Sequence, residues 1–333
     1  MLPAAIYKLS PPGYKLEADG IPIGMSVQNR LTSVSVNLYD GGQSDQLSLS
    51  FDDSSRLGSK KFTLPKTGKK LKLWMGYELR KILMGVFHVD QASLNGSGSG
   101  QTLSVTAVPK LLLNERSQTW ADTTLGDIVK KIAKENDLKA KISMKLGMTK
   151  VLIENQNRES DMSFLTKLAE KYGAMAKPAG ECVLFLTKGQ AVTASGIPLI
   201  PVILNANDII QWSTNLSDRS AYEGVIATWY DIRKAEQKQV VEGKKSDQTF
   251  YIQHLFSNED EAKVAAKSKL KELNRSTEEV SLTIVGHPEV TAGGSLVLMG
   301  LRSEVNGKWL VKSVTHTLNN SGYQSSLQCY REP

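Results

Sequence analysis

The residue types that most often carry catalysis are scattered in this chain of 333 residues. Its four histidines, His88, His254, His287 and His316, are isolated, and none has the HxH or HExxH spacing of a metal site. No serine stands in the GxSxG turn between a strand and a helix that exposes a nucleophile. The NGSGSG segment at 95–100 precedes a strand-like stretch, whereas a phosphate-binding loop precedes a helix. We therefore expect His88 and His316 to be structural or solvent-facing.

Carboxylates are the remaining candidates for acid–base chemistry. They cluster in four places: Asp52-Asp53, Glu159 with Asp161, Glu259-Asp260-Glu261, and Glu278-Glu279. The third cluster opens a helical pattern, where negative charge interacts favourably with the helix dipole. Glu159 and Asp161 also flank a helix start, although a glycosidase pair defined only by spacing in three dimensions stays open. We expect no enzyme and no catalytic residues, and a cell-wall hydrolase using Glu159 or Asp161 is the least favoured alternative.

The cysteines do not suggest a metal site. Cys182 and Cys329 lie far apart in strand-like stretches and lack the CxxC spacing. A tetrahedral zinc site needs about four soft ligands, so the two cysteines are expected to be small core residues in a reducing environment. No metal-binding or cofactor-binding residues are expected.

The basic balance of the chain makes nucleic acid a partner to weigh. Its net charge is +7 and its isoelectric point is about 9.1. The lysines are dispersed over 60–73, Lys130-Lys131 with Lys134, and 235–247, and none of these clusters is patterned with aromatic residues as base-stacking surfaces are. A mildly basic, solvated surface is favoured, with no sequence-specific nucleic acid as partner. The alternative is a basic nucleic-acid- or glycan-binding module.

No segment is expected to enter or cross a membrane. The start of the chain, MLPAAIYKLSPPG, has prolines where a signal peptide needs an apolar core. The longest apolar run, GIPLIPVIL, is short and broken by Pro198 and Pro201. We expect neither export nor membrane insertion.

Alternating apolar and polar residues predict a mainly β protein in three parts. The first part, 1–110, has strand patterns at 33–40, 45–53, 70–77, 82–94 and 101–108. The last part, 206–333, has them at 208–213, 222–232, 278–286, 294–300, 308–318 and 323–330. It also contains a helix at 258–274 and a charged stretch at 234–249, whose lack of apolar periodicity predicts an exposed loop.

The middle part, 111–205, is predicted to be a small α/β unit. A helix begins after Asp122-Thr123-Thr124, and its apolar stripe repeats with helical period from Leu125. A second helix begins near Asp161 and stops at Gly173. Strand patterns at 150–155 and 181–189 flank this second helix.

The first and last parts echo one another in sequence. A gap-free shift of 224 residues gives seven identities between 75–105 and the corresponding later segment. They include Met75-Gly76 on Met299-Gly300 and Leu94-Asn95 on Leu318-Asn319. Such an echo predicts a duplicated structural unit, although two unrelated hairpins with similar turns stay an alternative.

Several long blocks resemble one family. These are TWADTTLGDIVKKIA (119–133), QNRESDMSFLTKLAEKYGAMAK (156–177), LFLTKGQAVTASG (184–196), RSAYEGVIATW (219–229) and WLVKSVTHTLNNSGYQSSLQ (309–328). They are similar to the late control D family of contractile-tailed phages, whose members are baseplate hubs. That family is related in architecture to the hub part of type VI secretion tip proteins and to the hubs of tail-like bacteriocins. The resemblance covers essentially the whole chain.

The resemblance implies a fold, a set of partners and a location. It implies an α+β, mainly β chain with two tube-like β-barrel domains, at 1–110 and 206–333, separated by the small α/β domain. It implies a homotrimer that joins the hexameric tail tube to a separate trimeric spike, with contacts to baseplate wedge and tape-measure proteins. The location would be the baseplate at the tip of a virion or tail-like particle, assembled in the cytoplasm of the bacterial host.

Overall fold

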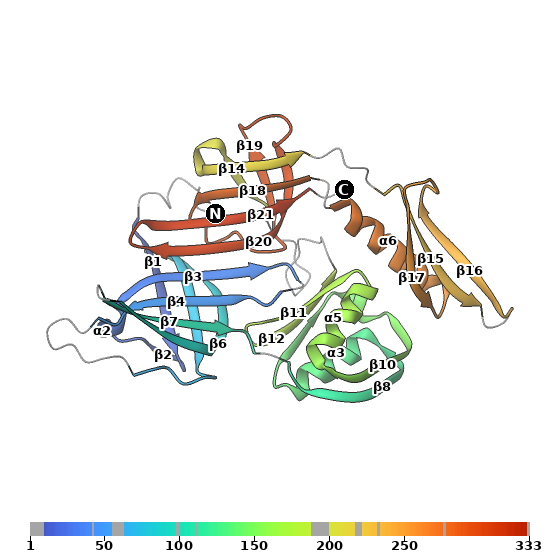
Figure 1. Cartoon of the computed structure of the whole chain (residues 1–333), viewed down its shortest axis with the longest axis horizontal. Coiled ribbons are helices and arrows are strands. Elements are labelled where there is room, and N and C mark those ends of the chain that lie inside the picture. Colours follow the sequence, from blue (N-terminus) through green and yellow to red (C-terminus); the bar gives the residue numbers. More distant parts are fainter. Residues whose placement is uncertain are drawn as a thin grey trace.

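The computed structural model describes most of the chain, and Figure 1 shows its arrangement. The described residues are 10–41, 43–54, 63–97, 100–110, 112–187, 200–216, 222–231, 234–275 and 278–331. Within these ranges, thirteen strands form one large, mostly antiparallel sheet, and three smaller sheets and five α-helices accompany it. No helix in these ranges is long and apolar enough to cross a bilayer.

The first seven strands build one half of the large sheet. They are β1 (Pro12–Ala18), β2 (Ile21–Pro22), β3 (Leu31–Tyr39), β4 (Gln46–Asp52), β5 (Lys70–Tyr77), β6 (Arg80–Ser97) and β7 (Gly100–Val108), with the short helix α2 (Met25–Gln28) before β3. The alternation in the sequence sets which face is buried, because successive strand residues point to opposite sides. In β3, for example, Val34, Val36 and Leu38 are buried and their neighbours are not. The predicted strands of this part are confirmed.

The end of the chain builds the other half. Its elements are β13 (Val202–Asn205), the 3-10 turn η1 (Ala206–Asp208), β14 (Ile209–Leu216), β18 (Glu278–Val285), β19 (Ser295–Met299), β20 (Gly307–Asn319) and β21 (Gly322–Tyr330). The two halves join where β20 pairs with β3. Their buried side chains merge into a single hydrophobic cluster. The sequence-based expectation of two β-barrels is thus met only as a large sheet: the described strands show no closed barrel, because the β3–β20 pairing joins both halves into one sheet with open ends.

The segment between the two halves has a hydrophobic cluster of its own. Its elements are β8 (Glu115–Thr124), α3 (Leu125–Glu135), β9 (Lys139–Ile142), α4 (Met144–Gly147), β10 (Lys150–Ser160), α5 (Asp161–Lys171), β11 (Ala174–Ala179) and β12 (Cys182–Thr187). Both predicted helices are confirmed and begin at capping side chains: Thr124 Oγ1 accepts a hydrogen bond from Asp127 N at 3.2 Å, and Ser160 Oγ from Ser163 N at 3.2 Å. Gly173 follows α5 with a φ of 62°, the left-handed conformation that commonly ends a helix.

A third unit lies at the far end of the molecule in Figure 1. It consists of β15 (Gly224–Asp231), β16 (Glu236–Gly243), β17 (Thr249–Phe256) and α6 (Glu259–Arg275). The predicted helix is confirmed, but the predicted exposed loop at 234–249 is wrong, because β16 pairs with β15 along its full length. Lys238 shows why composition misled: its aliphatic stem lies over the Trp229 ring and its ammonium group contacts Asp231 Oδ2 at 2.6 Å. A charged residue can therefore cover an apolar surface.

The two halves of the large sheet have the same strand order. The first runs β1-β5-β6-β7-β4-β3, and the second runs β13-β19-β20-β21-β18-β14. They differ in one respect, since β1 is antiparallel to β5 whereas β13 is parallel to β19. The internal echo in the sequence thus corresponds to a duplicated strand arrangement.

Two β-bulges occupy matching places in the two halves. In β6 the register against β7 shifts between Val89 and Gln91, and in β20 the register against β21 shifts between Val311 and Ser313. Superposing these bulges puts Val311 on Val89, a shift of 222 residues. The gap-free shift of 224 is therefore corrected by two residues for the hairpins, because pairing partners and not turn residues define the equivalence.

The second matching pair of bulges lies on the edge-forming strands. The register of β3 against β4 shifts between Leu31 and Ser33, and that of β14 against β18 shifts between Ile209 and Gln211. Ile209 thus corresponds to Leu31, a shift of 178 residues. Since bulges are specific features of a strand pair, their coincidence at two sites supports duplication over two unrelated hairpins.

Candidate functional site

His316 lies in the core of the large sheet, where it makes three polar contacts. Its Nε2 is 3.0 Å from the carbonyl oxygen of Val290, and its Nδ1 is 2.8 Å from Ser325 Oγ and 3.1 Å from the Tyr323 hydroxyl. Because a carbonyl oxygen can only accept, Nε2 carries the proton and Nδ1 accepts from the two hydroxyls. The expectation of a structural His316 agrees with this arrangement.

A serine hydroxyl beside an imidazole is also the geometry of a nucleophile and its base. Here, however, both His316 and Ser325 are 0% exposed, so no substrate reaches either side chain. Burial is the main reason that the pKa of His316 is lowered to about 4. The neutral ring acts as a buried connector between β20, β21 and the segment that contains Val290.

The other three histidines do not assemble a site either. His88 is partly buried and its pKa is lowered, first by desolvation and then by Lys70 and Lys110. His254 packs edge-on against Phe256 in β17. His287 donates its backbone N–H to Ser325 Oγ at 3.1 Å, so it lies beside His316 in the same polar core.

Asp161 and Glu159 have structural partners. Asp161 is 0% exposed and accepts hydrogen bonds from Arg116 at 2.5 Å, Asn136 at 2.9 Å and Gln156 at 3.0 Å. Glu159 Oε2 lies 2.7 Å from Lys167 Nζ. The two carboxylates that could have formed a glycosidase pair therefore brace the entrance to α5.

The remaining carboxylate clusters are also paired. Their ion pairs are Asp53 with Arg30 at 3.0 Å, Glu259 with Lys263 at 2.5 Å, Glu278 with Arg331 at 2.6 Å, and Glu279 with Lys312 at 3.0 Å. Cys329 is buried and Cys182 is half-buried, and neither forms a disulfide. Among the described residues, no group of three or more His, Cys, Asp or Glu is placed to hold a metal ion.

The lysine clusters project from three different units. Lys69 lies 3.8 Å from Asp19, and Lys70 pairs with Glu181. Lys130 lies 3.8 Å from Asp127 on α3, and Lys238 is bound in the β15–β16 hairpin. Lys60 and Lys61 lie outside the described residues. The described basic side chains thus form no common patch.

A buried ion pair that the sequence did not reveal links the middle segment to the large sheet. Lys177 of β11 places Nζ 3.0 and 3.1 Å from the two Asp45 carboxylate oxygens and 2.5 Å from the Tyr39 carbonyl. Asp45 also accepts from the Tyr39 backbone N–H at 2.9 Å. Because both charges are nearly fully buried and mutually satisfied, this contact fixes the middle segment against the β3–β4 turn.

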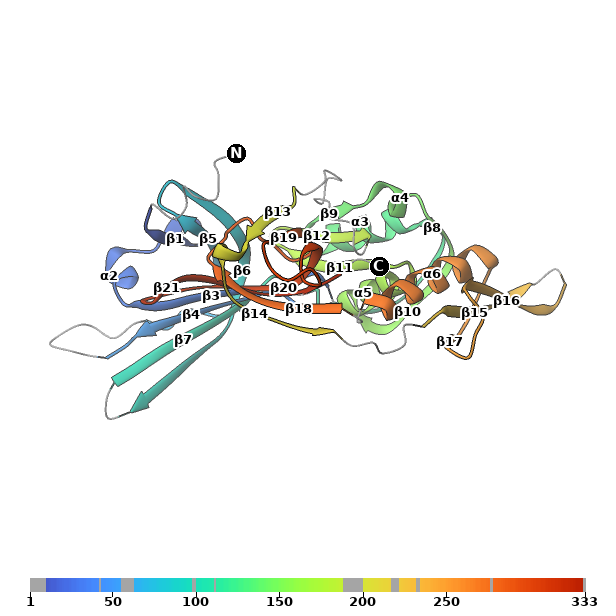
Figure 2. The same ribbon diagram turned by 90° about the horizontal axis from the view of Figure 1, so that it is seen from above.

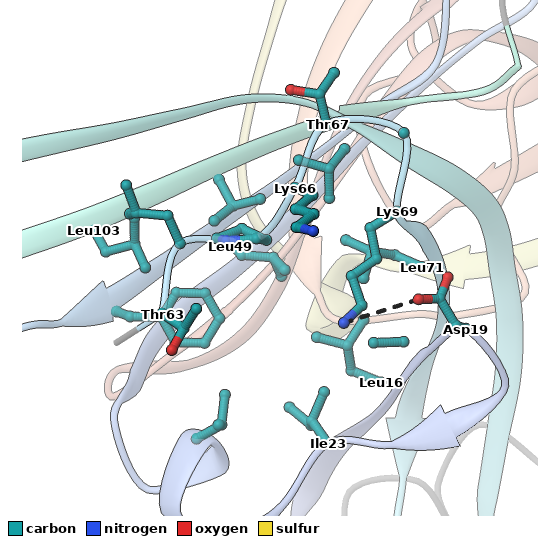
Figure 3. Close-up of a pocket in the computed structure, with 18 residues that line it drawn as sticks. Leu16, Asp19, Ile23, Leu49, Thr63, Lys66, Thr67, Lys69, Leu71 and Leu103 are labelled. Carbon is teal, nitrogen blue, oxygen red and sulfur yellow. Dashed lines mark ion pairs between the residues drawn. The ribbon is translucent and has the colours of Figure 1, made fainter. Parts of the chain in front are cut away.

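An apolar cavity of about 680 Å³ lies inside the first half of the sheet (Figure 3). Leucines from β1, β4, β5 and β7 line it, and the segment 63–69 forms one rim. Its described lining residues carry charge only at Asp19, Lys66 and Lys69. This chemistry is that of an incompletely closed core and not of a catalytic pocket.

The face of the large sheet opposite the core is polar and uncharged over eight strands. One cross-strand row consists of Gln91, Thr106, Ser48, Ser35, Thr317 and Gln324. A second consists of Gln211, Thr283, Ser326, Thr315, Asn37 and Gln46. Charged residues of this face, Asp52 and Glu279, stand near strand ends. We call this surface, from β14 through β20 and β3 to β6, the hydroxyl face.

The hydroxyl face ends abruptly at β5. On β5 and β1 the outward positions carry Lys70, Lys72, Lys15 and Glu17 instead. Lys15 Nζ lies 2.7 Å from Glu17 Oε1 and 4.6 Å from the centre of the Trp74 ring. One sheet therefore carries two different surfaces, which distinguishes a special face from generic solvent exposure. The Ser-Val alternation of 33–36 and 102–106 was its signal in the sequence, but only the apolar half of that pattern was interpreted.

The hydroxyl face is bounded by two unpaired strand edges. β14 pairs with β18 on one side, and no described strand pairs with its other side. β6 pairs with β5 only as far as His88 but with β7 as far as Ser97. Figure 2 shows the resulting β6–β7 hairpin projecting beyond its neighbours. Exposed edges of this kind are templates for strand addition from another chain.

A duplicated sheet with a special face and open edges is typical of a structural assembly protein, and comparison with known proteins identifies the class. Residues 68–322 match the phage tail baseplate hub (GPD) family. The chain is 28% identical to the "Probable baseplate hub protein" of Escherichia phage 186, over 95% of this chain and 92% of the relative.

Solved structures share the fold. The 43 kDa tail protein of prophage MuSo2 from Shewanella oneidensis superposes with a TM-score of 0.72 at 14% identity, over 96% of this chain and 98% of that chain. A component of the Escherichia coli type VI secretion system, described as similar to the T4 bacteriophage tail proteins gp27 and gp5, gives 0.62 at 12% identity, over 96% and 79%. The chain belongs to the phage tail baseplate hub family, and it is a structural component of the baseplate.

Proposed function

We propose that three copies of this chain surround the axis of a contractile tail or tail-like particle and join the hexameric tail tube to a separate trimeric spike. The observation that carries the proposal is the duplicated sheet, with matched strand order and matched bulges in its two halves. Each chain supplies two similar units, so three chains supply six. A three-fold assembly of this kind presents a six-fold pattern of strands to a hexameric tube.

The hydroxyl face is the proposed wall of the channel. Its neutral hydroxyl and amide groups hydrogen-bond to water and offer no array of charges to a passing polymer. Double-stranded DNA carries about one charge per 1.7 Å of its axis, so a lysine-lined wall would retain it. An uncharged wall lets DNA or a tape-measure protein pass without strong binding. The charged surface of β1 and β5 is then turned toward neighbours other than the channel contents.

The third unit and the middle segment lie on one side of the large sheet in Figure 1. We assign contacts with wedge proteins to these outlying units, and contacts with the tube, the spike and the tape-measure protein to the sheet around the channel. On this proposal the particle assembles in the host cytoplasm and carries the protein at its tail tip. The two β-barrel domains of the expected fold are, in the trimer, two segments of one closed wall.

The alternative of a basic binding module has less support. The described lysines are dispersed and largely paired, and the hydroxyl face is neutral. A DNA retention assay distinguishes the two functions, because a true binder loses affinity steeply between low and moderate salt. The proposed hub shows weak retention at both salt concentrations. The hydrolase alternative loses its basis because Asp161 is fully buried.

Copy number and position test the proposal. Purified tails are examined by quantitative mass spectrometry and by averaging of electron micrographs. The expected result is three copies of this chain for each ring of six tube subunits, located at the tip. A different copy number, or absence of the chain from the tip, would refute the trimeric hub.

A further inference from the structure

The junction between the two halves of the sheet shows how this fold joins one unit to the next. β3 and β20 are antiparallel, with Val36 opposite His316, Val34 opposite Leu318 and Ser35 opposite Thr317. On one face of this ladder are core side chains, and on the other are hydroxyl groups such as the Ser35 and Thr317 pair, whose oxygens are 3.3 Å apart. The junction thus continues both the core and the hydroxyl face.

The duplication identifies the equivalent of each junction strand. The bulge equivalences place β14 on β3 and β6 on β20. Yet β14 and the 91–96 part of β6 have no second strand partner among the described residues. They lie at opposite ends of the hydroxyl face, so they cannot be the two sides of one junction within this described sheet. Each chain therefore has one unused copy of either side of its own internal junction.

We propose that β14 of one copy pairs in antiparallel register with residues 91–96 of β6 in the next copy, with Thr214 opposite Leu94. This proposal rests on the trimer proposed above and specifies its interface. The same register sets Trp212 opposite Gly96 and Ser213 opposite Asn95. The pairing is head-to-tail, because each copy uses a different edge toward each neighbour, and such pairing closes into a ring.

The side chains fit the two faces of this ladder. Ser213 and Asn95 extend the hydroxyl face, as Ser33 and Asn319 do at the internal junction. Leu94 and Trp212 lie on the other face, where Trp212 already packs against the hydrophobic core. An aromatic residue opposite Gly96 covers backbone that the glycine leaves exposed, a pairing known to stabilise strand edges.

Exposure shows that one side of the interface is unoccupied in the single chain. Leu94 is 56% exposed, whereas His316, which has the equivalent position in β20, is 0% exposed. Ile210, at the bulge of β14, is also 54% exposed. Pairing of β14 with β6 from another copy would cover both edges, and it leaves no strand of the hydroxyl face without a neighbour on either side.

Site-specific cross-linking tests the register. The full-length chain carries Leu94→Cys and Thr214→Cys, on a Cys182→Ser background that removes the half-buried thiol. Cys329 is retained, because burial raises the pKa of its thiol and keeps it protonated. The matched control carries Leu94→Cys with Ser213→Cys, whose side chain points to the opposite face of β14. Both are oxidised as purified chain and in assembled tails, and analysed without reductant.

The expected product is a covalent ring of three chains. At least about tenfold more cross-linked chain is expected from the Leu94/Thr214 pair than from the control, because opposite-facing cysteines do not meet disulfide geometry. Equal cross-linking of the two pairs, or none in tails that contain three copies, would overturn the register while leaving the proposed trimer intact. Tails with another copy number would overturn the trimer itself.

Discussion

His316 and Leu94 hold equivalent positions in the two halves of the large sheet, but their surroundings differ completely. His316 is fully buried, opposite Val36, and bonded to Ser325 and Val290. Leu94 lies in a projecting hairpin and is more than half exposed. The strand order and the bulges around them are the same. The difference is therefore not one of fold but of whether the neighbouring unit belongs to the same chain.

This comparison explains why the chain has no catalytic site at its most polar core residues. At the internal junction, a histidine, a serine and a tyrosine satisfy one another and hold β20 in place. Tyr77 of β5 adds a hydrogen bond from its hydroxyl to the Gly286 carbonyl at 2.8 Å, so the network connects both halves. Buried polar groups of this kind specify one arrangement when all are satisfied.

The largest effect is expected from placing the same charge at both equivalent positions. His316→Asp removes three contacts and buries a carboxylate without a cation, which should cost about 3–5 kcal/mol of the free energy of unfolding. Chemical denaturation followed by circular dichroism measures this loss. A loss below about 1 kcal/mol would show that the junction is not the rigid core described above.

Acid should weaken the buried position and not the exposed one. The pKa of His316 is lowered from 6.5 to about 4 by burial. Both states are neutral at that residue at pH 7, but below pH 6.5 only the unfolded chain takes up the proton, so stability falls until about pH 4. The loss attributable to His316 is about 3 kcal/mol, at 1.36 kcal/mol for each pKa unit.

Two variants isolate that contribution. His316→Gln should remove the His316 part of the pH dependence, measured as the free energy of unfolding at pH 7 and pH 4. Leu94→His places an exposed imidazole at the equivalent position and should leave the pH dependence of the parent chain unchanged. An unchanged pH dependence in His316→Gln would contradict the assignment.

A smaller contrast is expected between Gly76 and Gly300, the two glycines aligned in the sequence echo. Gly76 has a φ of 152°, and a Cβ there would lie 2.3 Å from the Arg80 carbonyl oxygen. Gly300 has a φ of 78°, and its nearest neighbour, Ala206, would lie at an ordinary 3.6 Å. Gly76→Ala should cost about 2–3 kcal/mol through strain and overlap, and Gly300→Ala about 1 kcal/mol through strain alone. Thermal unfolding of both variants measures the difference, and equal costs would contradict it.

The smallest stability effect is expected at the exposed equivalent position. Leu94→Asp should change the free energy of unfolding by about 0.5 kcal/mol or less, as exposed substitutions usually do. It should nevertheless abolish ring formation, because the charge would enter the proposed ladder with β14. Denaturation and incorporation into tails are measured together, with Leu94→Val as the conservative control. Normal incorporation of Leu94→Asp would argue against β6 as an interface strand.

Local features of the fold were predictable from the sequence, and long-range pairing was not. The strands β3, β5 and β20 followed from alternation, and α3 and α5 from apolar period and capping residues. The strand β16 was missed because its apolar contribution comes partly from a lysine stem. The β3–β20 ladder joins residues about 280 positions apart, and no local pattern encodes such a partner.

The candidate surfaces followed the same division. Isolation of the histidines already argued against a catalytic centre, and the internal echo pointed to duplication. The Lys177–Asp45 pair, 132 residues apart in the chain, could not be inferred from composition. The hydroxyl face emerged only once the register aligned serines and threonines from distant strands.

A reconstruction of the assembled tail tip tests the central claim most directly. The account predicts one continuous wall of strands around the axis, with Ser35 and Thr317 facing the channel and Thr214 of each copy beside Leu94 of the next. A tip in which this surface faces outward, or in which β14 and β6 remain apart, would contradict it.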